Sequence, residues 1–351
     1  MKSQNNLRTW NSHVHIYSSK NKETWRIPYD NKKNEILHMK KIIYILFFAL
    51  SFSIAKAQQD PQYSQYMFNH VVINPGYTGS KDALSTTLQM RKQWVGIDGS
   101  PQTNDFSIHG PLKSKNIGLG GHIVLEQIGP KRWVSGYGDF AYHIKIGKGK
   151  LGLGVSAGMI SYQYDFSKIT YNISELASTT IGELNRNKTS FDANFGAYYR
   201  TNAMFIGYGI THITEPKLYQ ITTGGTINPT TFNFNAKRHH FITIGRGFRL
   251  SDNVIFSPSI LIKSLEMAGG QNIDVNFNFL LAKKLWLGTS VRSSKNVIVL
   301  AQYLINPKFK IGYSFDYVYG GISKGRNNSH EIMLGYNFSS AKSHIISPRY
   351  L

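Results

Sequence analysis

The sequence predicts an all-β protein: a transmembrane, up-and-down antiparallel β-barrel of about 14 strands with an N-terminal plug or cap segment. Three observations predict this fold. Apolar and polar residues alternate through most of the chain after residue 84, the connections between these segments are short and long in turn, and the chain carries an export signal.

The export signal occupies residues 39–57. A basic pair precedes an apolar run, residues 42–54, which is shorter than the roughly 20 residues that a membrane-spanning helix needs. A small-x-small pattern ends at Ala57, so we expect signal peptidase to cut there. Residues 1–38 are polar and show no sustained period, and we expect them to be an upstream extension from a start codon assigned too early.

Strands with one apolar and one polar face are expected along the rest of the chain. In residues 271–281, for example, Ile273 and Val275 fall on one face and the intervening Asn and Asp residues on the other. The same period of two predicts strands at 84–93, 103–108, 117–127, 132–146, 151–164, 190–200, 204–212, 239–249, 254–262, 271–281, 285–292, 296–305, 309–317 and 330–338. The barrel is thus expected at residues 84–338, followed by a tail at 339–351.

The connections favour an outer-membrane barrel, which has tight periplasmic turns and longer external loops. Short connections such as 147–150 and 282–284 alternate with longer ones such as 165–189 and 213–238. In hydrocarbon, every backbone group must be paired, which requires a closed ring. A soluble periplasmic sandwich is the alternative, but it would bury its apolar faces inward. Tyrosines near strand ends further favour lipid contact: Tyr162, Tyr164, Tyr198 and Tyr199.

The composition limits the kinds of partner and site that the protein can have. The chain has 40 Lys+Arg and 19 Asp+Glu, of which residues 1–57 hold ten and three, so the mature part carries +14 (30 minus 16). This balance suits an acidic partner, and export argues against nucleic acid. The chain has no cysteine, which excludes a disulfide framework, a thiolate metal site and a lipoprotein anchor.

Motifs for catalysis or cofactor binding fail their structural context. GKGKLG at 147–152 matches a dinucleotide-binding pattern, but strand-like sequence follows it where a helix is required. His239 and His240 point to opposite faces of a strand and cannot share a metal. We therefore expect no enzyme activity, no cofactor and no metal. The acidic residues of the polar faces are expected to hydrogen-bond with Lys, Arg and Asn side chains of the lumen: Asp139, Asp192, Asp274, Asp316 and Glu331.

The short connections form a basic rim if they all face the periplasm. Lys283, Lys284 and Lys308 are the residues of this rim that we expect to dock a partner, and Asp252 is the only acidic residue near the rim. We expect the rim to dock an acidic periplasmic partner by charge complementarity. The alternative is that lysines simply decorate polar turns, because the longer loops also carry basic residues.

Residues 58–83 precede the first strand and show neither strand alternation nor a helical stripe. The segment is dense in aromatic residues and turn formers. We expect it to be ordered, either plugging the lumen or covering the periplasmic mouth. The alternative is a loose periplasmic tail.

Sequence boxes in and around this segment resemble the PorP/SprF family of the type IX secretion system of Bacteroidetes. They are DPQYSQYMFNHVVINPGYTGS at 60–80, RKQWVGIDGSPQT at 91–103, HGPL at 109–112 and SPRYL at 347–351. The family usually reads closer to NPAYAG where this chain has NPGYTG. The likeness marks these family-motif or plug residues: Asp60, Pro61, Ser64, Gln65, Tyr66, Asn69, Asn74, Pro75, Gly79 and Trp94.

The resemblance implies an outer-membrane barrel of a Gram-negative, Bacteroidetes-type bacterium that works in type IX protein secretion and gliding motility. Such proteins support the secretion or surface attachment of specific cargo proteins, such as large adhesins, and can associate with periplasmic proteins linked to peptidoglycan. The alternative is a passive diffusion porin of the outer membrane, because a porin shares the barrel.

Overall fold

The computed structural model describes residues 60–81, 83–113, 116–165, 186–223, 230–266, 271–320 and 328–338. The expected upstream extension (1–38), signal peptide (39–57) and tail (339–351) lie outside the described residues, as do residues 58 and 59.

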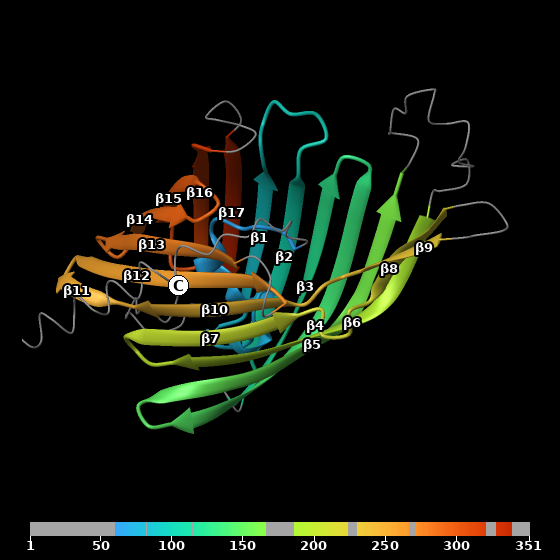
Figure 1. Cartoon of the computed structure of the whole chain (residues 1–351). Helices are drawn as coiled ribbons and strands as arrows, with labels where there is room; N and C mark the ends of the chain where they lie inside the picture. Colours follow the sequence, from blue (N-terminus) through green and yellow to red (C-terminus); the bar gives the residue numbers. More distant parts are fainter. Residues whose placement is uncertain are drawn as a thin grey trace, which may run out of the picture. The chain divides into compact units, whose positions relative to one another are not determined.

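Antiparallel strands form a closed ring in the described chain (Figure 1). Its members are β1 (Ser85–Lys92), β2 (Gln102–Pro111), β3 (Ile117–Ile128), β4 (Lys131–Ile146), β5 (Gly149–Tyr164), β6 (Arg186–Arg200), β7 (Met204–Thr211), β10 (His239–Arg246), β12 (Val254–Leu265), β13 (Gln271–Leu281), β14 (Leu285–Arg292), β15 (Asn296–Leu304), β16 (Phe309–Val318) and β17 (Ser329–Asn337). Neighbours in sequence pair with one another, β1 pairs with β17, and β10 pairs with β12 across the remaining gap. The strands close on themselves as hydrocarbon requires, although β6 pairs with β7 only over residues 195–200. This confirms the predicted 14-strand antiparallel barrel.

The ladder between β10 and β12 is interrupted opposite Pro258. A four-residue strand, β11 (Phe248–Ser251), continues the line of β10 and pairs with the start of β12. The last β10 pair is Gly245 with Ser259, and the first β11 pair is Phe248 with Phe256. Proline has no N–H to donate, which accounts for the break. On its other side, β12 pairs with β13 without interruption and runs to Leu265, three residues beyond the prediction.

A hairpin lies where the sequence predicted only a long connection, at 213–238. It consists of β8 (Lys217–Thr223) and β9 (Thr230–Asn235), which pair only with each other in the described chain. The prediction missed both strands because they are six and seven residues long and lie among turn-forming Thr, Gly, Asn and Pro residues.

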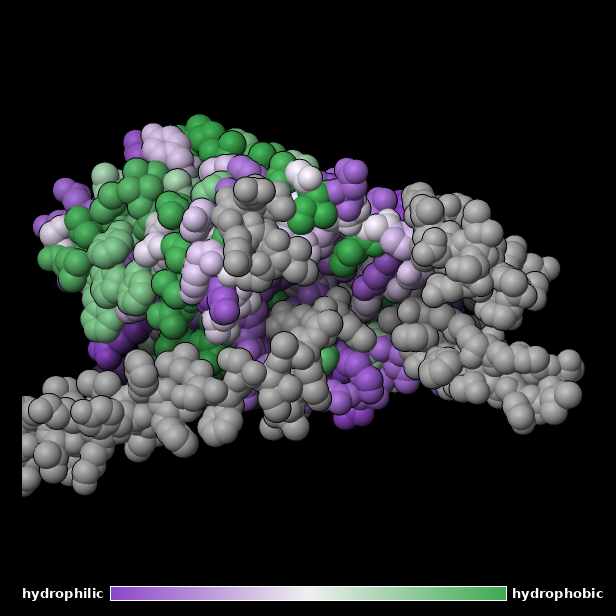
Figure 2. Space-filling model, turned by 45° about the horizontal axis from the view of Figure 1, so that its top comes forward, coloured by the Kyte–Doolittle hydropathy of each residue, from purple (hydrophilic) through white to green (hydrophobic). Residues whose placement is uncertain are grey.

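The apolar faces of the strands point outward. Large hydrophobic residues are exposed on strands around the ring, including Met90, Phe106, Ile123, Phe140, Val155, Phe191, Ile242, Phe277, Val299, Tyr313 and Ile332. Figure 2 shows part of this apolar surface. The polar faces are buried, the reverse of a soluble sandwich and typical of a barrel in lipid. Within the described residues, no helix is long and apolar enough to cross a membrane.

Three of the tyrosines expected at the lipid interface point inward instead, among them Tyr164, which is partly buried and packs against the cluster of Trp133 and Tyr162. Tyr162 is 3% exposed and packs against Trp133, and Tyr198 is 4% exposed and packs against Phe205. Strand ends were assumed to be lipid-facing, but the side chain's parity along the strand decides its face.

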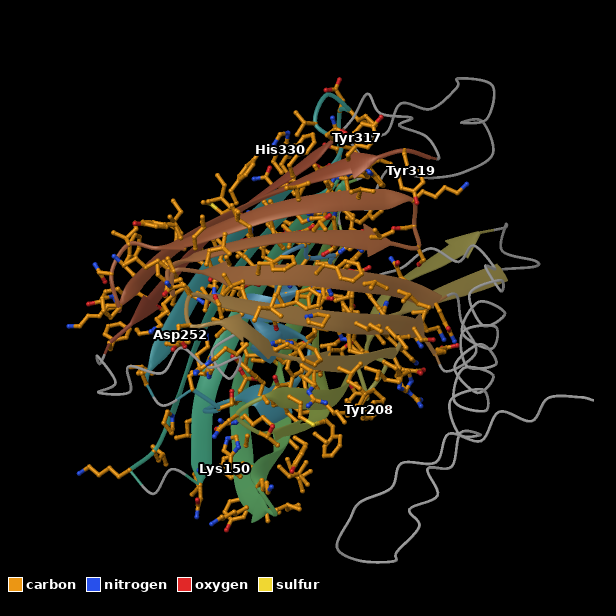
Figure 3. The ribbon with its side chains drawn as sticks, turned by 90° about the vertical axis from the view of Figure 1, so that its left-hand side faces the viewer. Lys150, Tyr208, Asp252, Tyr317, Tyr319 and His330 are labelled. Atoms are coloured by element: carbon orange, nitrogen blue, oxygen red, sulfur yellow. The ribbon has the colours of Figure 1, made fainter. Side chains whose placement is uncertain are left out.

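The two barrel ends differ. The "turn end" carries the connections 112–116, 147–148, 201–203, 252–253, 282–284 and 305–308, and the "loop end" lies opposite. Figure 3 shows Lys150 and Asp252 toward the turn end, and Tyr319 and His330 toward the loop end.

Candidate functional site: the lumenal segment

Residues 60–81, here called the lumenal segment, lie inside the barrel. The segment contains three short 3-10 helices, η1 (Tyr66–Phe68), η2 (His70–Val72) and η3 (Pro75–Tyr77), and most of its residues are buried. It runs from the loop end, where Asp60 meets His212, to the turn end, where it leads into β1. Its polar and ring contacts reach strands around the whole ring: β1, β2, β4, β6, β7, β12, β13, β14, β16 and β17.

Side chains of the barrel strands form hydrogen bonds with backbone groups of the lumenal segment. The carboxylate of Glu331 accepts hydrogen bonds from the backbone N–H groups of Ser64 and Gln65, both at 2.8 Å. Arg292 Nη2 donates to the carbonyl of Tyr63 at 2.8 Å. Buried backbone groups outside helices and sheets need such partners. The polar lumen therefore supplies hydrogen-bond partners to the backbone of this segment.

A buried ion-pair network anchors the first part of the segment. Arg91 contacts Asp316 at 2.7 Å and Glu331 at 3.3 Å, and each side chain is at most 1% exposed. Ser64 Oγ donates to Asp316 at 2.8 Å and accepts from Arg91 Nη1 at 2.7 Å. Buried charges are tolerated when they are paired and hydrogen-bonded in this way.

All five acidic residues expected on the polar faces do point inward. Asp274, Asp316 and Glu331 pair with arginines, as expected. Asp139 and Asp192 differ: their described partners are His, Ser, Thr and Tyr side chains.

The NPGYTG box forms a tight corner against the wall. Asn74 caps η3, because its Oδ1 accepts from Gly76 N at 2.9 Å, while its Nδ2 donates to the carbonyl of Ala197 at 3.1 Å. Pro75 occupies the first position of the helix, where its missing N–H costs nothing. Two wall glycines make the close approach possible: a Cβ at Gly152 or Gly196 would overlap with atoms of this corner.

Aromatic packing fills the turn-end half of the lumen. Phe68 lies edge-on to Trp286 with ring centroids 6.0 Å apart. The His70 ring lies within 5.6 Å of the rings of Tyr77, Tyr198 and Phe205, and neither ring nitrogen has a hydrogen-bond partner. Burial, together with the charge of Lys81, lowers the pKa of His70 to about 3, so this ring is a neutral packing element.

A second polar cluster holds the start of the segment at the loop end. His212 Nε2 lies 2.7 Å from Asp60 Oδ1, and its Nδ1 lies 2.6 Å from Asp192 Oδ2. Burial alone would lower the pKa of His212, but the two carboxylates outweigh burial and raise it to about 10. For Asp60, burial is likewise outweighed by His239, His212 and Lys263, which hold its pKa well below the usual range.

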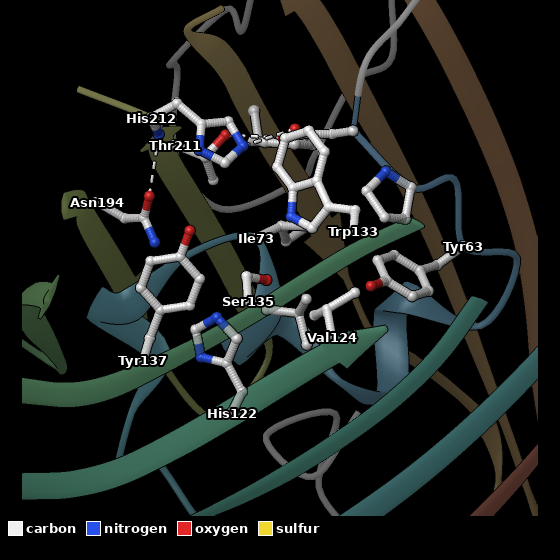
Figure 4. A pocket seen from close by; sticks show the side chains of 14 residues that line it. Tyr63, Ile73, His122, Val124, Trp133, Ser135, Tyr137, Asn194, Thr211 and His212 are labelled. Carbon is white, nitrogen blue, oxygen red and sulfur yellow. Dashed lines mark hydrogen bonds and ion pairs between the residues drawn. The ribbon is translucent and has the colours of Figure 1, made fainter. Parts of the chain in front are cut away.

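A cavity of about 40 Å³ lies beside this cluster (Figure 4). Asp60 and His212 line it together with Trp133, Tyr137 and Asn194. This volume is enough for about three or four water molecules at roughly 10–15 Å³ each.

The candidate site residues predicted from the sequence lie in three places: the lumenal segment, the loop end and the turn end. The lumenal segment contains Asp60, Pro61, Ser64, Gln65, Tyr66, Asn69, Asn74, Pro75 and Gly79. Trp94 lies apart from them, in the β1–β2 connection at the loop end, with φ 47° and 38% exposure. Lys283, Lys284 and Lys308 are exposed at the turn end. Their neighbour Lys310 points into the lumen, where its Nζ lies 5.7 Å from the centroid of the Phe68 ring. The roles of these residues remain predictions.

One further segment, GVSAG at 154–158, fits the GxSxG pattern of serine hydrolases, which the sequence prediction did not include. That motif needs a sharp strand-to-helix turn, whereas Ser156 lies within β5. Ser156 donates to Asp139, and His122 bonds to the same carboxylate, so the base does not contact the hydroxyl. This arrangement lacks the order of contacts that activates a serine.

The Asp60 cluster was not predictable from sequence spacing. Asp60, Asp192, His212 and His239 belong to four separate parts of the chain and meet only when the barrel closes. The one available signal was the inward parity of Asp192 and His239 on their strands.

The sequence of this barrel matches the family model described as "Type IX secretion system membrane protein PorP/SprF" over residues 55–336. The chain belongs to the PorP/SprF family. Membership confirms the resemblance predicted from the sequence boxes and assigns the protein to the type IX secretion system. PorP/SprF membership and the closed barrel with an apolar outer face together place the protein in the outer membrane. No curated protein matches the sequence significantly.

Several solved outer-membrane proteins are similar to this PorP/SprF member. Outer membrane protein Omp33 of Acinetobacter baumannii is 9% identical, with 74% of this chain and 100% of that chain covered and a TM-score of 0.44. A FadL homologue of Pseudomonas aeruginosa is 11% identical, with 80% and 95% covered and a TM-score of 0.46. The toluene transporter TodX of P. putida is 9% identical, with 77% and 94% covered and a TM-score of 0.44.

Proposed function

We propose that this PorP/SprF protein is a non-catalytic anchoring and docking component of type IX secretion and gliding motility. It supports the secretion or surface attachment of specific cargo proteins and docks periplasmic partners. The observation that carries the proposal is the lumenal segment, which is bound to strands on all sides of the ring. A lumen filled in this way suits a rigid platform better than a passive pore, the alternative function.

The basic residues of the turn end supply a docking surface under this proposal. Lys283 and Lys284 lie in the β13–β14 turn and Lys308 in the β15–β16 turn, and all three are exposed. Exposed like charges gathered at one rim attract an acidic surface and raise its association rate. In the topology of outer-membrane barrels, tight turns face the periplasm, so this rim is suited to an acidic periplasmic protein.

Purification from native membranes tests the docking role. Tagged protein is extracted in mild detergent, and co-purifying proteins are quantified by mass spectrometry. The triple variant K283E/K284E/K308E should lose an acidic periplasmic component at least tenfold while it retains its secreted cargo. The matched control reverses three exposed charges at the loop end, R132E/K188E/K295E, and should retain the periplasmic component. Equal recovery from both variants would refute docking at this rim.

A further inference from the structure

We propose that Asp60, His212 and His239 form a binding site for a divalent transition-metal ion, with Zn²⁺ the best match, that fastens the start of the lumenal segment to the barrel wall. Their ligand atoms all lie within 4.8 Å of one another. A carboxylate oxygen and two imidazole nitrogens are a donor set that suits zinc.

The three residues come from elements that the fold already holds together. His212 follows β7, His239 begins β10, and these two strands are paired. Asp60 reaches both: its Oδ1 lies 2.7 Å from His212 Nε2, and its Oδ2 lies 3.3 Å from His239 Nδ1. All three side chains are at most 8% exposed. A metal ion here would link the chain's start to two wall strands.

The surroundings supply the second layer of contacts that metal-binding histidines require. Asp192 Oδ2 lies 2.6 Å from His212 Nδ1, which orients the ring so that Nε2 faces Asp60. Thr211 Oγ1 donates to Asp60 Oδ2 at 2.8 Å and positions that carboxylate. Lys263 donates to the backbone carbonyl of Asp60 at 2.9 Å and not to its carboxylate.

Two adjustments convert the cluster into a metal site. Ligand atoms around a tetrahedral Zn²⁺ with bonds of about 2.0–2.1 Å are roughly 3.4 Å apart. The Asp60–His212 contact of 2.7 Å therefore opens slightly, and His239 rotates away from the Lys237 carbonyl that its Nδ1 contacts at 3.0 Å. The adjacent cavity of about 40 Å³ holds the water that completes the coordination.

A competing account explains the cluster without any metal. His212 as an imidazolium between two carboxylates would satisfy the same contacts. The metal account predicts that the protein binds Zn²⁺ and that binding requires His239. The metal-free account predicts that no Zn²⁺ is bound.

The test uses the full mature chain purified in detergent, stripped with chelator, incubated with Zn²⁺ alone and desalted. We expect about one Zn²⁺ per chain by elemental analysis, and less than about 0.2 for H212Q and for H239Q. D192N should still bind, with an affinity about 10–100-fold weaker. The matched control is H143Q, because His143 is a buried histidine that contacts the Thr78 carbonyl at 2.8 Å and does not line this cavity.

Folding is checked by heat-dependent mobility on gels, and Co²⁺ provides an independent readout. Co²⁺ in place of Zn²⁺ should give visible absorption bands of a nitrogen- and oxygen-ligated tetrahedral centre, and folded H239Q should lose them. If the intact protein binds no Zn²⁺ at stoichiometric level, or if folded H239Q binds as much as H143Q, the proposal is wrong.

Discussion

Arg91 on β1 and Asp316 on β16 form an ion pair of 2.7 Å in the barrel lumen, and both side chains are at most 1% exposed. Ser64 of the lumenal segment hydrogen-bonds to both partners. The pair therefore links two wall strands to Ser64, which lies 21 residues before the start of β1 in the sequence.

Breaking this pair should strongly destabilise the barrel. In D316N, Arg91 keeps a buried positive charge with one fewer carboxylate, which typically costs about 3–5 kcal/mol. The measurement is urea unfolding in detergent, followed by heat-dependent gel mobility. The control is E215Q, because Glu215 pairs with the half-exposed Arg238, and such pairs contribute about 0.2–1 kcal/mol. Similar losses in both variants would show that the buried pair has no special role.

Adding one methyl group to Gly152 should displace the NPGYTG corner. The Cβ of G152A would overlap with the carbonyl oxygen of Gly76, and such overpacking costs about 1–3 kcal/mol. We expect a lower unfolding midpoint and faster protease cleavage within residues 60–81. G138A on the neighbouring strand β4 is the control, because its Cβ would have no atom closer than 4.0 Å. Protease resistance unchanged in G152A would mean that the corner is not held against this wall.

Stability should fall in acid partly because of His70. Its pKa is about 3 in the folded protein and 6.5 when exposed, so the unfolded chain binds more protons below pH 6.5. His70 should lower the free energy of unfolding by about 2 kcal/mol between pH 6.5 and pH 5, since each pKa unit corresponds to about 1.4 kcal/mol. H70F loses no hydrogen bond, because neither ring nitrogen has a partner. Unfolding midpoints at pH 5.0 and 7.5 should differ less in H70F than in the parent; an unchanged difference would exclude His70 as a source.

A charge on the outer face should impair insertion into lipid. Val299 is 57% exposed near the middle of β15, so V299R would place a guanidinium in the hydrocarbon. Arginine at the midplane of a barrel costs about 2–4 kcal/mol. The folded fraction in lipid vesicles should drop for V299R and stay unchanged for V299L. Equal folding of the two variants would contradict contact between this face and lipid.

Much of the barrel could be predicted from sequence because its information is local. Alternation of period two, as in residues 271–281, fixes both the strand and the side that faces lipid. The family boxes identified the PorP/SprF family before any contact was known. Local patterns fail for β8 and β9, because short strands contain too few residues to show a clear alternation. They also fail for Tyr162, which was placed at the lipid interface because it is a tyrosine near a strand end.

The lumenal contacts could not be predicted from the same patterns. Arg91 and Asp316 are 225 positions apart, and no local signal states which inward residues meet across the lumen. The cap at Asn74 is an exception, because an asparagine two residues before a glycine and next to a proline is a local helix-start signal.

Planar-bilayer conductance of the intact mature chain tests the central claim most directly, namely that residues 60–81 fill the lumen of a docking platform. The intact protein should give no large, steady single-channel conductance, whereas a folded variant that lacks residues 60–81 should give one. A large, steady conductance from the intact protein would contradict this account and favour a diffusion porin.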